Sequence, residues 1–221
     1  MKALVPALVL FLSITPSVAS ADVLPFTFAG TVDFVDPALS SAFALGDPLS
    51  GTFAFDSNGQ ATSCGFNFKT YCSAYPSPLQ TFSGTLGSSY DLSGTFYVRL
   101  NTPPSGPPDA WELFSDPPSL QSSLTAPSVN GNAPASFKIT LVDPSGTALD
   151  QQLVPPVFQD YAERRFQLAF VAPDGVSSFL VGGTITSLAA VPEPGTTTLL
   201  AAGLGVFLGR RRRREQCRSS E

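Results

Sequence analysis

One short pattern recurs five times along the chain and restricts the folds that it can adopt. A Gly-Thr pair stands just before or inside a run of alternating apolar residues at 28–34 (FAGTVDF), 49–55 (LSGTFAF), 82–86 (FSGTL), 92–100 (LSGTFYVRL) and 181–188 (VGGTITSL). Residues two apart on a strand share a face, as Phe53 and Phe55 do in the second copy. Residues 136–143 and 165–172 continue the alternation. These segments are predicted to be strands that each bury one face.

Composition supports short strands rather than helices. The 221 residues include 18 Gly and 21 Pro, and charged residues make up only 13%. Long amphipathic helices need Ala, Leu, Glu and Lys instead. Turn-forming groups at 56–59, 103–108, 143–146 and 172–175 separate the predicted strands. We therefore expect an all-β domain of eight or nine strands, an antiparallel β-sandwich or jelly-roll-like fold, with 101–109 and 115–134 as surface loops and one helical turn within 158–166.

Two features of the composition exclude classes of function. The chain contains no histidine, so catalytic triads, His general bases and the commonest transition-metal ligand are absent. Between Asp22 and Val191 five basic residues stand against fourteen acidic ones. A domain with this charge has no electrostatic attraction for nucleic acid phosphates.

The N-terminus has the organisation of a secretory signal peptide. Lys2 precedes the apolar run 3–14, and Ala19-Ser20-Ala21 forms a small-x-small cleavage site. Cleavage after Ala21 is predicted, which makes 1–21 the signal peptide and 22–190 the exported domain. The alternatives are an uncleaved anchor and a buried helix.

The C-terminal end combines three elements in a fixed order. Val191-Pro192-Glu193-Pro194 is followed by the apolar stretch 196–209 and then by Arg210, Arg211, Arg212, Arg213 and Arg214. As a helix the apolar stretch would be roughly 21 Å long, against a hydrocarbon core of about 30 Å. A marginal transmembrane helix is expected, with the arginines as a cytoplasmic stop-transfer signal and 215–221 as a cytoplasmic tail. A core helix is the alternative interpretation.

This C-terminus, over 191–214, resembles a PEP-CTERM sorting signal. The resemblance implies an exported protein of a Gram-negative bacterium, and an exosortase of the inner membrane that recognises Pro192-Glu193-Pro194 and processes the chain nearby. The other implied partners are the Sec translocon, signal peptidase and, transiently, the inner membrane. The released domain is then expected at the cell surface or in the extracellular matrix. Prolines keep the motif extended and expose Glu193.

Cys64 and Cys72 are the cysteines of the exported part. Their separation suits a loop disulfide in an oxidising compartment, with free thiols as the alternative. Two cysteines without histidine make no zinc site, and no cofactor is expected. Asp56-Ser57-Asn58-Gly59 resembles the start of a calcium loop, with an ordinary turn as the other interpretation. Asp33 with Asp36, at a predicted strand end, is a second calcium candidate.

Three functions remain open at this point. The first is a non-catalytic structural or adhesive protein of the cell surface or matrix, with no catalytic residues. The second is a carbohydrate-binding module that holds exopolysaccharide, in which Trp111 contacts a sugar instead of lying in the core. The third is a hydrolase that uses Asp109 with Glu112, or Asp160 with Glu163. A sugar-binding aromatic strip around Trp111, or two facing carboxyl groups in a cleft, would distinguish them.

Overall fold

The protein folds into a closed barrel of antiparallel strands. The computed structural model describes residues 23–60, 62–63, 71–102, 108–116, 122–149, 153 and 155–191. The strands are β1 (Val23–Val35), β2 (Pro48–Asp56), β3 (Thr62–Ser63), β4 (Tyr71–Leu86), β5 (Tyr90–Thr102), β6 (Asp109–Ser115), β7 (Ser123–Thr125), β8 (Ala133–Asp143), β9 (Glu163–Val171) and β10 (Ser178–Ala190). Within the described ranges, helical turns occur at η1 (Pro37–Leu39) and η3 (Phe158–Asp160). All the segments predicted as strands lie in strands, and 158–166 contains the expected turn.

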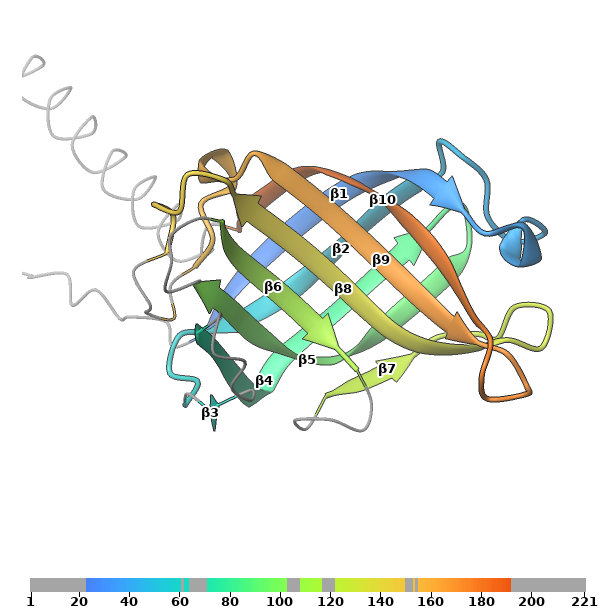
Figure 1. Cartoon of the computed structure of the whole chain (residues 1–221), viewed down its shortest axis with the longest axis horizontal. Coiled ribbons are helices and arrows are strands. Elements are labelled where there is room, and N and C mark those ends of the chain that lie inside the picture. Colours follow the sequence, from blue (N-terminus) through green and yellow to red (C-terminus); the bar gives the residue numbers. More distant parts are fainter. Residues whose placement is uncertain are drawn as a thin grey trace, which may run out of the picture.

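The prediction of a sandwich or jelly roll was wrong. Strands β1, β2, β4, β5, β6, β8, β9 and β10 neighbour one another in chain order, and β10 pairs with β1 to close the ring (Figure 1). Short β3 and β7 add to β4 and β5. Alternating burial is the same in a sandwich and in a barrel, because both bury one face of every strand. Pairing of the first long strand with the last is what separates the two folds.

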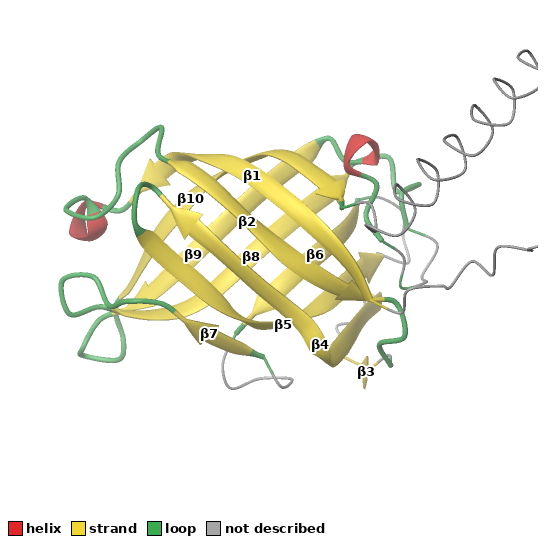
Figure 2. Ribbon diagram, turned by 180° about the vertical axis from the view of Figure 1, so that it is seen from behind, coloured by secondary structure: helices red, strands yellow, loops and turns green. Residues whose placement is uncertain are grey.

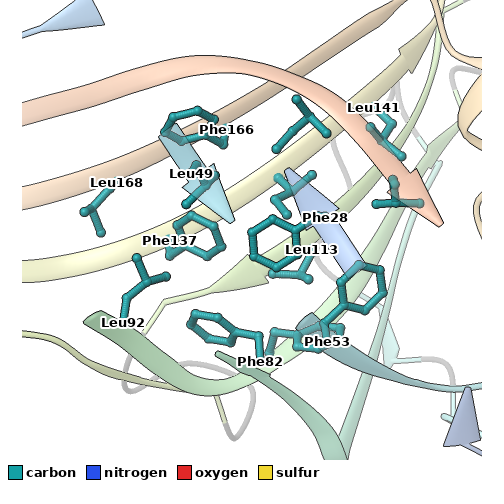
Figure 3. Packing of buried hydrophobic residues seen from close by; sticks show 14 of the residues in the cluster. Phe28, Leu49, Phe53, Phe82, Leu92, Leu113, Phe137, Leu141, Phe166 and Leu168 are labelled. Atoms are coloured by element: carbon teal, nitrogen blue, oxygen red, sulfur yellow. The ribbon is translucent and has the colours of Figure 1, made fainter. Parts of the chain in front are cut away.

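The interior of the barrel is filled by side chains. Phe53 and Phe137 are 2% and 0% exposed and come from opposite sides of the ring, and Phe82 stacks on Phe137 with ring centroids 5.2 Å apart (Figure 3). Trp111 is fully buried in the same cluster, which supports its interpretation as a core residue. An eight-stranded barrel is just wide enough to be filled in this way.

The recurring Gly-Thr pattern has a steric explanation in this packing. In three copies the Gly faces the interior, while the flanking Ser and Thr face outward. A Cβ on Gly51 would lie 2.5 Å from Cζ of Phe28, and a Cβ on Gly84 would lie 3.3 Å from the same atom. Glycine at these positions therefore leaves room for a phenylalanine ring in the barrel.

The barrel has two distinct ends (Figures 1 and 2). At the terminal end, β1 begins and β10 ends, and Val191 N–H donates to the carbonyl of Pro25 at 2.8 Å. At the opposite loop end lie the β1–β2 connection, the β4–β5 turn and the segment between β7 and β8. Val23 and Val191, the first and last described residues, thus lie on the side away from these loops.

The predicted signal peptide (1–21) and transmembrane segment (196–209) lie outside the described residues. Among the described residues, no helix is long and apolar enough to cross a membrane.

Candidate functional site

The loop end of the barrel is hollowed. A concave surface of about 830 Å³ is bounded by the β1–β2 connection, the β4–β5 turn and the segment that follows β7. Its polar side chains include Ser40, Ser41, Asp47, Ser88, Ser89, Ser128 and Asn130. We call this surface the end hollow.

The β1–β2 connection is held in place by its own side chains. The carboxylate of Asp36 accepts the N–H of Ala38 at 3.0 Å and caps η1. Asp47 accepts the N–H of Ala44 at 2.8 Å. Phe43, only 3% exposed, packs its ring edge against Tyr90 with centroids 4.9 Å apart. These contacts make the wall of the end hollow a rigid part of the fold.

Asn130 joins this connection to the segment after β7. Its amide donates to the carbonyl of Ala38 at 2.9 Å and to Oγ of Ser41 at 2.8 Å. Its backbone has φ of +52°, in the left-handed region that few non-glycine residues adopt. The side-chain hydrogen bonds compensate for that conformation.

Tyr90 lies under the floor of the hollow as a protonated donor. Its hydroxyl donates to the carbonyl of Pro127 at 2.7 Å. Burial raises the pKa of Tyr90 to about 12, since the charged phenolate would lose its hydration. The hydroxyl therefore stays protonated near neutral pH and holds Pro127 in place.

A second hollow of about 660 Å³ runs over the outer wall of β2, β4, β5 and β7. Ser89 and Pro127 line both hollows, so the two form one continuous surface, which we call the hydroxyl groove. Its outer-wall part contains the row Thr52, Ser83, Ser93 and Thr125, which are successive register partners on four strands.

The hydroxyl row results from the same motif that fills the core. Because Gly51, Gly84 and Gly94 face inward, the flanking residues Ser50, Thr52, Ser83, Thr85 and Ser93 face outward. Sequence analysis identified this motif but assigned it only to strands. The signal that could have identified the groove is the repetition of Ser and Thr two positions apart in three neighbouring strands.

The electrostatic character of the groove is mildly negative. Its charged lining residues are Asp47 and Asp91, and none of the described residues that line it is Lys or Arg. Asp91 accepts the hydroxyl of Thr85 at 2.8 Å. Apart from these two carboxylates, the polar side chains that line the groove are neutral.

The first carboxylate pair proposed from the sequence is not brought together. Three positions separate Asp109 from Glu112 on β6, so their side chains point to opposite faces. Glu112 lies on the outer face, where Arg99, Asn101 and Thr140 hydrogen-bond to it. Asp109 accepts the N–H of Leu149 at 3.3 Å.

Asp143 is a partner of Asp109 that sequence analysis did not identify. The two are register partners on β6 and β8, and each is 5% exposed. However, the carboxylate of Asp143 is occupied by Ser145, Thr147 and Ala148 of the following loop. These hydrogen bonds, the Ser145 hydroxyl foremost, hold the pKa of Asp143 well below its usual range. The pair therefore organises a loop.

The second proposed pair also lacks a cleft. Asp160 belongs to η3 and Glu163 begins β9, and both are exposed. The nearby hydroxyl of Tyr161 has its pKa raised by burial first, and then by Asp160, Asp109 and Asp143. This tyrosine is protonated at neutral pH.

The carboxylates of the two calcium candidates are engaged by hydrogen bonds within the fold. Asp56 accepts the N–H of Asn58 at 2.9 Å and the hydroxyl of Ser77. Asp33 accepts the hydroxyl of Thr184 at 2.9 Å, and Asp36 caps η1. Over the part of the chain that the structure describes, no group of three or more His, Cys, Asp or Glu could hold a metal ion.

Several predicted site residues lie where the structure gives no description. These are Cys64 with the side chain of Cys72, Pro192, Glu193 and Pro194, and Arg210 to Arg214. Val191 is described: it is 39% exposed and lies directly after β10. The sorting sequence therefore begins where the wall of the barrel ends.

Comparison with known proteins addresses this terminal sequence. Residues 190–214 match the model of the PEP-CTERM protein-sorting motif. No curated protein and no solved structure gives a significant match to the chain. The matched region coincides with the resemblance stated from the sequence and starts at Ala190, the last residue of β10. The chain therefore carries a PEP-CTERM protein-sorting motif, and it is an exported protein targeted to an exosortase.

Proposed function

We propose that this chain is a non-catalytic structural or adhesive protein of the cell surface or extracellular matrix. In this proposal the Sec translocon and signal peptidase release the N-terminus, and the segment 196–209 holds the chain transiently in the inner membrane. Exosortase then processes the chain near Pro192-Glu193-Pro194. The barrel is the part that remains after processing.

The observation that carries the adhesive role is the polarity of the barrel. Val23 and Val191 lie at the terminal end, and Val191 is hydrogen-bonded to Pro25. The end hollow is lined by the β1–β2 connection and the β4–β5 turn, which lie at the loop end of the barrel (Figure 1). A barrel tethered through its C-terminal segment would therefore present the end hollow away from the membrane.

The contacts of the acidic residues favour a non-catalytic barrel over a hydrolase. Glu112 is bound by Arg99, and Asp143 is bound by its own loop. Glycoside hydrolysis needs two carboxyl groups that face one another across a substrate. Trp111 lies in the core, so a carbohydrate-binding role would have to use another surface.

Mass spectrometry of the full chain tests the sorting step. The chain would be expressed in cells with and without an exosortase, together with Glu193→Gln and the matched control Glu163→Gln. We expect the wild type and the control to lose residues 210–214 only where exosortase is present, and Glu193→Gln to retain them. An intact C-terminus in the exosortase-positive cells would refute the proposal.

Surface localisation tests the role itself. Protease treatment of intact cells should degrade the processed wild-type protein and leave unprocessed Glu193→Gln enriched in the membrane fraction. Recovery of the processed protein in the periplasm alone would contradict a surface or matrix function.

A further inference from the structure

We propose that the hydroxyl groove binds a neutral polysaccharide chain. This inference rests on the proposed surface function and identifies the partner of the barrel. It begins from continuity: the end hollow and the outer-wall hollow share Ser89 and Pro127. A continuous open track suits an extended polymer better than a small compact ligand.

The lining chemistry indicates a ligand rich in hydroxyl groups. Ser and Thr hydroxyls each offer one donor and two acceptor sites, and Asn130 adds an amide. The groove combines these groups on four strands and three connections. A polysaccharide offers the same alternation of donors and acceptors along its length.

The spacing of the hydroxyl row fits an extended chain. Thr52, Ser83, Ser93 and Thr125 are register partners on β2, β4, β5 and β7. Since neighbouring strands lie about 4.8 Å apart, the row extends over roughly 15 Å. The end hollow extends the hydroxyl groove beyond the β4–β5 turn.

Charge determines which polymers fit. Asp47 and Asp91 line the groove, and its described lining contributes no positive side chain. A uronate or phosphate polymer would meet repulsion there and no compensating ion pair. The groove therefore favours a neutral glycan over an anionic one.

Stacking on aromatic rings contributes little to binding at this surface. The rings of Phe43 and Tyr90 are only 3% and 8% exposed, so they support the floor and offer little face for stacking. Affinity must come from many hydrogen bonds, each contributing about 1 kcal/mol. We therefore expect a short segment of a glycan to bind weakly, and a long polymer, which makes many such hydrogen bonds, to be retained more strongly.

The groove needs little rearrangement to bind. Asn130 ties two connections together, Tyr90 holds Pro127, and Thr52 lies 3.2 Å from Ser83 between hydroxyl oxygens. Side chains that are already ordered lose less entropy on binding.

Affinity electrophoresis of the detergent-purified full chain tests the inference. Native gels would contain dextran, laminarin or galactomannan as neutral probes, and polygalacturonate as the anionic probe. We expect retardation by at least one neutral polysaccharide and none by polygalacturonate.

Variants locate the binding surface. Ser89→Trp places a large side chain at the junction of the hollows and should abolish retardation. Thr52→Val removes one groove hydroxyl with little change of shape and should weaken binding about fivefold. Ser187→Trp, on the exposed face of β10 outside the groove, is the matched control and should bind as the wild type does. Far-UV circular dichroism on thermal unfolding verifies that each variant is folded, because two of the variants contain a second tryptophan besides Trp111.

Three results would overturn the inference: no retardation by any neutral probe, equal retardation by polygalacturonate, or undiminished binding by both groove variants. If processing and surface localisation persist in any of these cases, the polysaccharide inference fails while the proposed function stands. Failure of export or processing would refute the proposed function whatever the gels show.

Discussion

Replacing Gly183 by Ala tests whether an interior glycine is required for packing at the seam of the barrel. Gly183 lies on β10 opposite Val32 of β1, at the seam that closes the ring. A Cβ there would overlap the carbonyl oxygen of Thr31 and lie 2.5 Å and 2.7 Å from two ring atoms of Phe166. Comfortable carbon–carbon separations are about 3.5–4.0 Å. Phe166 is 1% exposed, so its ring has no free space into which to move.

The expected magnitude follows from two opposing terms. Overpacking in a dense core costs about 1–3 kcal/mol, and the obstruction by a backbone carbonyl places this site at the upper end. Replacing Gly by Ala also lowers the entropy of the unfolded chain, which stabilises the folded state by about 0.4–1 kcal/mol. We expect Gly183→Ala to lower the free energy of unfolding by about 2 kcal/mol, close to a 30-fold change in the folding equilibrium.

The neighbouring Gly182 supplies a matched control. A Cβ on Gly182 would lie 3.5 Å from the carbonyl oxygen of Phe166 and 4.0 Å from Cβ of Phe34, which are ordinary contacts. Gly182→Ala should therefore leave stability unchanged or raise it by about 0.5 kcal/mol.

Urea unfolding, followed by the fluorescence of Trp111, measures both variants. Trp111 is the single tryptophan and is fully buried, so its emission reports on the core. With a urea dependence of about 2 kcal/mol per molar, the midpoint of Gly183→Ala should fall by about 1 M. Equal midpoints for the two alanine variants would refute the steric explanation of the motif.

Two further predictions concern buried polar groups. The lowered pKa of Asp143 means that its ionised form stabilises the fold above the unfolded pKa of about 3.9, and that this contribution is lost as pH falls through the folded pKa. Asp143→Asn should thus lower the urea midpoint at pH 7. Between pH 5 and pH 3 this variant should lose less stability than the wild type does, and exposed Asp160→Asn serves as the control. A pH dependence equal to that of the wild type would contradict this prediction. Ser77→Ala removes the hydroxyl that donates to buried Asp56 and should lower the free energy of unfolding by about 1–3 kcal/mol. The control Ser88→Ala, at an exposed position, should change it little. Equal melting temperatures of the two variants would exclude a structural role for the contact.

Local patterns in the sequence were sufficient for the strands. The alternation around Phe53 and Phe96 places apolar side chains on one face whatever the strand pairs with, because the side-chain period of a strand is a local property. Strand β6 was not predicted, since Trp111, Glu112 and Leu113 are all buried and interrupt the alternation. The burial of Glu112 depends on Arg99 and Thr140, which are distant in the sequence.

The candidate site was much harder to predict from the sequence than the strands were. Asp109 and Glu112 are close along the chain but lie on opposite faces, whereas Asp143 becomes the neighbour of Asp109 through pairing of β6 with β8. Thr52 and Thr125 belong to one row although 73 positions separate them in the numbering. Which residues become neighbours across a sheet depends on the register between strands, and no local sequence pattern specifies that register.

The all-β class, the Gly-Thr strand motif and the C-terminal sorting motif could all be predicted from the amino-acid sequence alone. These features depend on neighbouring residues, on the period of a strand and on a linear order of segments. Closure of the sheet into a barrel became evident only in the three-dimensional structure, because closure needs β1 to pair with β10 across nearly the whole domain. In this barrel the first and last described residues, Val23 and Val191, lie at one end and the end hollow lies at the other.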